Sequence, residues 1–351
     1  MPALQDLADE LFLEIFSHLV CSDVARVCLV SQHFRALGEI SLYRIRTLIS
    51  IHHPQRLHER FIHSLLTRPE LACHRLGLQH NIQIPPSPLQ FLLHLLPNLH
   101  GLHLLCTESR DFDNFIEKLL YHNGPQNLPI WLRKLRHVRY SWAEAHVGLD
   151  WDTLLALFLL PSIQSIDVHI SVATLSLGVI LRVPSALTHF ALVDFEILAP
   201  VFDARALGEA LRPLRGTLRY LRIGLCDYCD MGPEVFDDGA TNTIGGFSDW
   251  PALEIFRCSL TLLVGRGMGA FGGLAGVLPI RIREVAIEAD QYWSGKETAD
   301  AIEELMGQKD MFGLENLAVI TVGRKVRGEV ERMRVACQGV GVLLKLSSTW
   351  C

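Results

Sequence analysis

The chain has 351 residues, enough for one large domain or two of ordinary size. Hydrophobic residues make up 49% of it and charged residues 20%, a composition that excludes long disorder and lets the chain bury a core without disulfides or metals. The 32 Lys and Arg residues are outnumbered by 38 Asp and Glu residues, which excludes a nucleic-acid binder that works by charge alone.

The acidic residues near the N-terminus and the cysteine usage indicate an intracellular protein. The nine cysteines are scattered singly, as is typical of reduced thiols in a cytoplasmic or nuclear protein. Asp6, Asp9, Glu10 and Glu14 fall within the first 20 residues, where a secretory signal would carry no such charges. The uncharged run at residues 76–107 contains four prolines, so we do not expect it to span a membrane. We expect a cytoplasmic and/or nuclear protein that binds neither membrane nor nucleic acid.

The first predicted element is an amphipathic helix at residues 7–19. Leu7, Leu11, Ile15 and Leu19 recur every four positions, which places them in one apolar stripe over about three helical turns.

A second helix is predicted at residues 23–37. Ser22 supplies an N-cap, Asp23 a first-turn carboxylate and Gly38 a C-cap. Two short helices cannot bury this much apolar surface against each other, which indicates a partner face.

These residues resemble an F-box, whose usual opening is Leu-Pro-x-Glu-Leu followed by an Ile-Phe-Ser-x-Leu helix. LADEL at 7–11 and IFSHL at 15–19 fit this pattern, and Ala8, where proline is common, departs from it. The resemblance implies docking on the Skp-type adaptor of a cullin–RING (SCF) ubiquitin ligase. The candidate adaptor-binding residues, some of which should instead pack the core of the helices, are Leu7, Leu11, Ile15, Phe16, Leu19, Val24, Val27 and Val30. The alternative is an ordinary amphipathic helical hairpin.

The remainder repeats the pattern L-x-x-L-x-L, with any apolar residue at the three sites. The first sites are Leu99, Leu135, Ile163, Leu187, Leu218, Leu253, Ile282 and Leu314. We interpret Leu71/Leu76/Leu78 as a looser first copy and Leu343/Leu346 as a final capping strand. Period-2 apolar residues predict a short strand, and about 20 intervening residues allow a helix, so each unit needs neighbours to bury its apolar face.

The pattern resembles degenerate leucine-rich repeats, and an F-box followed by such repeats looks like the fungal F-box proteins of this length. The resemblance implies an α/β fold: an F-box at 1–48, a connecting helix at 49–70, and a leucine-rich-repeat-like solenoid at 71–351. In such a solenoid, parallel strands line the concave face and helices lie outside.

The residue between the second and third apolar sites is expected on the exposed strand face. The candidates for binding a protein target are His103, Arg139, Arg219, Arg222 and Arg257, joined by Tyr228 and Trp250 from an insertion at 227–250. The arginines suggest a basic patch for acidic or phosphorylated segments; a solvated face of mixed charge is the alternative. The insertion holds six Asp and Glu and no Lys or Arg, which fits either recognition of a basic partner or a solvated loop.

Catalytic and cofactor motifs are weak. Gly267 to Gly272 fit G-x-G-x-x-G, with Glu288 and Asp290 about 20 residues on, but the motif lies inside one repeat and leaves little room for a helix before Pro279. Cys226 and Cys229 lack the second pair that a zinc site needs. We therefore predict a non-catalytic substrate receptor without metal or cofactor. The alternatives are a leucine-rich-repeat scaffold outside any ligase and a nucleotide-binding enzyme using the 267–272 loop.

Overall fold

The fold divides into two compact units. A computed structural model describes residues 7–19, 21–48, 75–79, 99–106, 130–142, 160–169, 186–195, 204–225, 243–265, 273–289, 293–308, 310, 312–322 and 327–349. Unit 1 comprises Met1–Ala143 and Val147–Ser162, and unit 2 comprises Glu144–His146 and Ile163–Cys351. The connecting helix expected at 49–70 lies outside the described residues.

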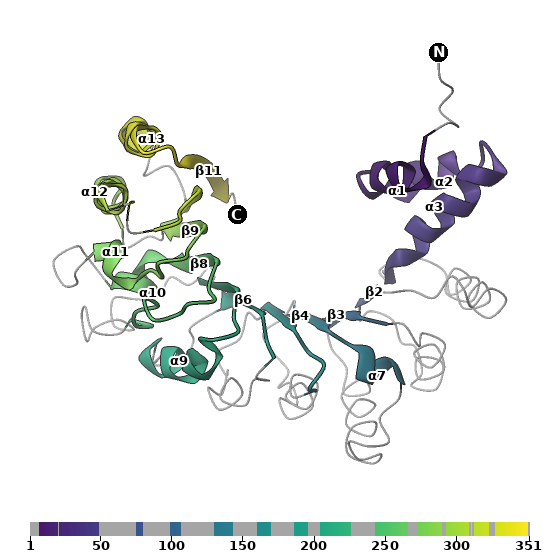
Figure 1. The fold of residues 1–351 in the computed structure, drawn as a ribbon, viewed down its shortest axis with the longest axis horizontal. Coiled ribbons are helices and arrows are strands. Elements are labelled where there is room, and N and C mark those ends of the chain that lie inside the picture. The colour runs from purple at the N-terminus through teal and green to yellow at the C-terminus, as the bar shows by residue number, and fades with distance from the viewer. Residues whose placement is uncertain are drawn as a thin grey trace. The chain divides into compact units, whose positions relative to one another are not determined.

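Unit 1 begins with three helices, α1 (Asp9–Ser17), α2 (Cys21–Val27) and α3 (Gln32–Arg44), drawn in purple in Figure 1. The first prediction is confirmed in position, but the single second helix at 23–37 is wrong. The chain turns between α2 and α3, because the Ser31 hydroxyl accepts the Phe34 N–H at 3.1 Å and so caps a new helix. The expected N-cap, Ser22, lies inside α2.

Gly38 is a packing residue within α3, and its predicted role as a C-cap is wrong. A Cβ atom there would overlap the Cys28 Sγ and stand 3.4 Å from Val24 Cγ1. Glycine thus lets α3 approach the end of α2 closely, and the helix continues for six more residues to Arg44.

Among its described residues, unit 1 continues with four parallel strands that pair in sequence order. They are β1 (Ile45–Leu48), β2 (Arg75–Gln79), β3 (Gly101–Cys106) and β4 (His137–Trp142), with α7 (Ile130–Lys134) preceding β4. Leu76 aligns with Leu102, and Leu102 with Val138, as the repeat predicts. Strand β1 is an addition to the prediction, since it falls within the residues assigned to the F-box.

The described residues of unit 2 form seven strands, again parallel and paired in sequence order. They are β5 (Ser165–His169), β6 (His189–Phe195), β7 (Tyr220–Leu225), β8 (Ile255–Ser259), β9 (Glu284–Ala289), β10 (Asn316–Val322) and β11 (Leu343–Thr349).

The repeat pattern sets the register of these strands. The second apolar sites align from Ile166 through Phe190, Leu221, Phe256 and Val285 to Leu317. Every first site of the eight copies is buried. The predicted capping strand at Leu343/Leu346 is confirmed as β11, but in it Leu344 rather than Leu343 aligns with Leu317, and Leu343 is exposed.

The same backbone hydrogen-bond pattern precedes strand β4 and each of the strands β6 to β10. The carbonyl oxygen of Thr188 accepts the N–H groups of Arg219 at 2.8 Å and Tyr220 at 3.0 Å. The carbonyl of Arg219 in turn accepts those of Glu254 and Ile255, at 2.9 and 3.0 Å. These hydrogen bonds join neighbouring repeats through main-chain atoms. The arrangement therefore tolerates variation in the side chains.

Helices and short 3₁₀ turns connect the strands of unit 2. They are α9 (Ala204–Leu211), η5 (Arg212–Leu214), α10 (Leu260–Val264), α11 (Gly273–Val277), α12 (Gly295–Gly307), η9 (Arg327–Glu329) and α13 (Val330–Gly339). Helices α10 to α13 contact one another in sequence order alongside the strands (Figure 1). The described helices include none long and apolar enough to cross a bilayer.

Candidate functional site

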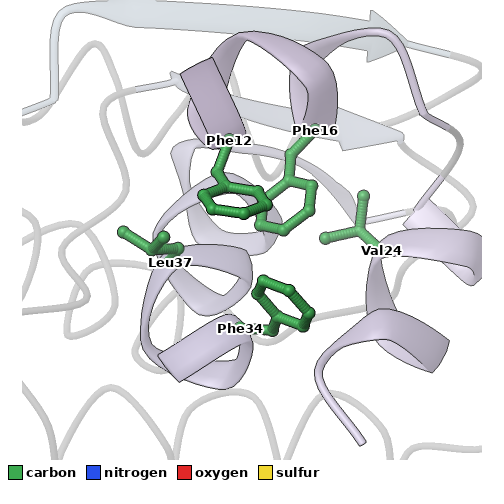
Figure 2. Close-up of a cluster of buried hydrophobic side chains, with 5 residues drawn as sticks. All are labelled: Phe12, Phe16, Val24, Phe34 and Leu37. Carbon is green, nitrogen blue, oxygen red and sulfur yellow. The ribbon is translucent and has the colours of Figure 1, made fainter. Parts of the chain in front are cut away.

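The three N-terminal helices enclose a small aromatic core. Figure 2 shows Phe12 and Phe16 of α1 facing Phe34 and Leu37 of α3, with Val24 of α2 at one side. The rings of Phe12 and Phe34 meet edge to face with centroids 5.0 Å apart, and those of Phe12 and Phe16 lie 6.1 Å apart. Five buried side chains thus fill the space between the helices, and Leu7, Leu11, Ile15 and Leu19 are not among them.

The apolar residues that recur every four positions along α1 lie outside this core. Leu11 and Ile15 are neighbours one helical turn apart, and they are 52% and 44% exposed. Leu7 and Leu19, just beyond the two ends of α1, are also exposed. The row of apolar side chains therefore faces away from the helices' own core, as expected of a surface that a partner covers.

A second exposed apolar group lies in the turn between α2 and α3. Leu29 is 86% exposed and Val30 is 71% exposed. Val30 is among the predicted adaptor-binding residues and Leu29 is not, because a continuous helix at 23–37 would place Leu29 off the face of Val24, Val27 and Val30. Recognising Ser31 as an N-cap would have placed both residues in a turn.

Two predicted adaptor-binding residues lie in the core. Phe16 is only 4% exposed and Val24 only 3%, so their side chains hold the helices together rather than face a partner. Val27 is half-buried and packs against the same core. The exposed large apolar residues of these helices are therefore Leu7, Leu11, Ile15, Leu19, Leu29 and Val30, which we call the apolar stripe.

The predicted strand-face residues align across unit 2. Asp167, Ala191, Arg222, Arg257, Ala286, Ala318 and Lys345 form one row across strands β5 to β11. In unit 1, His103 aligns with Arg139, which is exposed. The sequence pattern thus identified a continuous set of positions opposite the buried leucines.

Carboxylates accompany the two central arginines. Arg257 donates to Glu284 Oε1 at 2.9 Å, and an Arg222 nitrogen lies 3.7 Å from Glu288 Oε1. All four side chains are about one-third exposed or less. This region is therefore mixed in charge rather than the basic patch that the arginines alone suggested.

An aromatic group lies beside these ion pairs. Tyr220 stacks on His189 with ring centroids 5.8 Å apart, and the Arg257 guanidinium lies over the Tyr220 ring at 5.8 Å. Burial raises the pKa of the Tyr220 hydroxyl, an effect partly opposed by Arg257 and Arg222, and burial lowers the pKa of His189. Both groups are therefore neutral near pH 7.

Arg219 lies in a neighbouring row where charges alternate. Four successive repeats place a charged residue just before strands β7 to β10: Arg219, Glu254, Arg283 and Glu315. Arg283 binds Glu315 through two hydrogen bonds of 3.1 Å. The row as a whole carries no excess of positive charge.

The aromatic residues at the end of the insertion are structural. Trp250 is 3% exposed and packs edge to face on Phe247, which in turn contacts Phe256 of β8. The predicted recognition role for Trp250 is therefore wrong. Its ring fills the core, and Asp249 beside it pairs with Arg215 at 3.3 Å. Tyr228 lies outside the described residues.

The described residues give no support to a nucleotide site at the glycine motif or to a metal site. Residues 266–272 and the pair Cys226/Cys229 lie outside them, and α11, which follows the glycine motif, has only five residues. Glu288, one of the two carboxylates about 20 residues after the motif, lies 3.7 Å from a nitrogen of Arg222. Within the described ranges, no three His, Cys, Asp or Glu side chains gather as a metal site.

Comparison with known families identifies the N-terminal helices. Residues 4–41 match the F-box domain, so the chain carries an F-box made of α1, α2 and most of α3. F-box domains bind Skp-type adaptors of cullin–RING ligases, which implies a substrate-adaptor role in an SCF complex. A search of curated proteins gave no match to the chain.

Proposed function

We propose that this protein is the substrate receptor of an SCF-type ubiquitin ligase and binds the Skp-type adaptor through the apolar stripe of its F-box. The observation that carries the proposal is the separation of core from surface. Phe12, Phe16 and Phe34 complete the core, while Leu11 and Ile15 stay about half exposed on the same helix bundle. Covering such a stripe with a partner removes apolar surface from water, which stabilises the complex.

The remaining strands form the target-binding part of the proposal. We interpret β2 to β11 as irregular leucine-rich repeats of a solenoid, like those of fungal F-box proteins. The supporting facts are the parallel pairing in sequence order, the aligned apolar sites and the recurring backbone hydrogen bonds. The protein target would lie on the strand face, where Tyr220, Arg222 and Arg257 offer aromatic and charged contacts.

The receptor itself performs no chemistry in this proposal. It raises the effective concentration of a target lysine near the conjugating enzyme, which other subunits supply. Such a protein works in the cytoplasm and/or nucleus, with neither nucleic acid nor membrane as a partner.

The test is co-purification of the adaptor and the cullin with the full chain. We expect the wild type to retain both, and the variant Leu11→Asp/Ile15→Asp to lose both, because two carboxylates would be buried in the interface. The matched control is Ile280→Asp/Val335→Asp, which places the same two charges at exposed apolar residues of unit 2. Retention of the adaptor by Leu11→Asp/Ile15→Asp would refute docking through the stripe.

One observation favours the scaffold alternative, in which the chain works outside a ligase. Ala8 occupies the N-cap of α1, and no side-chain hydrogen bond caps that helix. An adaptor that co-purifies without any cullin would support this second function.

A further inference from the structure

A polar hollow lies between helix α9 and the loop at residues 243–247. Gly208 lets the two come together, because a Cβ atom on Gly208 would overlap the carbonyl oxygen of Ile244. The hollow has a volume of about 280 Å³, and the residues around it include Phe247 and Trp250, whose rings are buried in the core. It lies away from the strand-face arginines, on an inter-strand helix of unit 2.

Two arginines and a carboxylate line the helical side of this hollow. Arg205, Glu209 and Arg212 lie three and four residues apart and so share one face of the helical segment. Arg212 pairs with Glu209 at 3.1 Å, but both side chains are more than half exposed, so the pair is weak. Within the described chain, Arg205 has no ion-pair or hydrogen-bond partner. The three side chains leave a net charge of +1.

The loop side offers main-chain donors. The N–H groups of Ile244 and Phe247 donate to Leu262 and Val277, at 2.9 and 2.7 Å. Gly245 and Gly246 lie between them and line the hollow, and Gly245 has a φ of 94°. Among the described residues, neither of these two glycine N–H groups donates to a carbonyl. Glycine-rich turns with free N–H groups are a common way to bind oxyanions.

We propose that this hollow binds a phosphate group carried by a segment of the target protein. A phosphate provides close to two negative charges and three acceptor oxygens, which matches two guanidinium groups better than a single carboxylate does. The volume exceeds that of the group alone and leaves room for the side chain that carries it. This proposal rests on the proposed function, because it takes the phosphate to belong to a protein that the receptor binds. It adds that this target protein is phosphorylated.

The test is calorimetric titration of the purified full chain at constant ionic strength, without adaptor. The probes are a blocked Ala-phosphoserine-Ala peptide, its unphosphorylated form and inorganic phosphate. We expect the phosphopeptide to bind more tightly than inorganic phosphate, and the unphosphorylated peptide not to bind. Binding of inorganic phosphate but not of the phosphopeptide would overturn the assignment to a target segment, and binding of neither would overturn the site.

Variants locate the site. Arg205→Ala and Arg212→Ala should each weaken phosphopeptide binding roughly tenfold or more, through loss of charged hydrogen bonds. Glu209→Gln should strengthen it several-fold, an effect that misfolding cannot produce. The matched control is Arg215→Ala, since Arg215 pairs with Asp249 and does not line the hollow. Equal affinity in wild type and Arg205→Ala would refute the site. Adaptor binding is measured in a separate experiment. Failure of the phosphate site can therefore be distinguished from failure of the proposed receptor function.

Discussion

Substituting Gly38 by alanine tests how the F-box helices pack. A methyl group at Gly38 would overlap the Cys28 Sγ, whereas its distances to Val24 Cγ1 and Phe16 Cε2, 3.4 and 3.8 Å, are ordinary contacts. Overpacking of this kind costs about 1–3 kcal/mol, while alanine in a helix gains about 1 kcal/mol over glycine. We therefore expect Gly38→Ala to destabilise α3 locally by about 1 kcal/mol.

The same substitution should change sign once the sulfur is removed. In a Cys28→Ala background the overlap disappears, and Gly38→Ala should stabilise α3 by about 1 kcal/mol through helix propensity alone. The two backgrounds thus differ by about 2 kcal/mol, a coupling expected only for side chains in contact.

Hydrogen–deuterium exchange of the full chain measures this coupling, because it reports local opening of α3, and a chain with two compact units is not expected to unfold in one transition. Backbone amides of residues 32–44 should exchange about fivefold faster in Gly38→Ala and more slowly when the substitution is made on Cys28→Ala. Slower exchange in both backgrounds would show that packing does not require this glycine, and would refute the reasoning.

Three further predictions concern stability and thiol chemistry. Ala8→Pro should stabilise α1 by about 0.4–1 kcal/mol, because Ala8 already has a φ of −65°, and slower amide exchange in α1 checks this. Ser294→Ala should cost about 1 kcal/mol by removing the capping box with Glu297, so unchanged exchange in the first turn of α12 would contradict it. Cys337 is buried, and burial raises its pKa to about 11, so mass spectrometry should find it alkylated by iodoacetamide at pH 8 only after unfolding.

The strand register could be predicted from the sequence because it depends on a repeated local pattern. Each L-x-x-L-x-L copy carries its own first buried residue, and each strand pairs with the next one along the chain. Errors appeared where the pattern fades, as at the final strand, where Leu344 rather than Leu343 aligns with Leu317.

The electrostatics of the strand face could not be predicted in the same way. Glu288 meets Arg222 from two strands away and 66 residues later in the chain, so only the assembled sheet brings them together. The sequence shows the arginines but not their pairing with carboxylates, so from the sequence a basic patch and a face of mixed charge both stayed open.

The F-box shows a similar limit. Periodicity revealed the stripe at Leu11 and Ile15, but it did not separate core from surface for Phe16, which follows Ile15 on α1, or for Val24, which lies on α2. That assignment depends on where α3 crosses α1, and hence on the turn capped by Ser31.

The most direct test of the account is a calorimetric titration of the full chain with the Skp-type adaptor. Leu11 and Ile15 are about half exposed, so covering the rest of each side chain contributes about 1 kcal/mol, and Leu11→Ala/Ile15→Ala should raise Kd roughly 30-fold. Val335→Ala, a matched loss of an exposed apolar side chain on α13, should leave Kd unchanged. Equal Kd values for wild type and Leu11→Ala/Ile15→Ala would contradict docking through the apolar stripe.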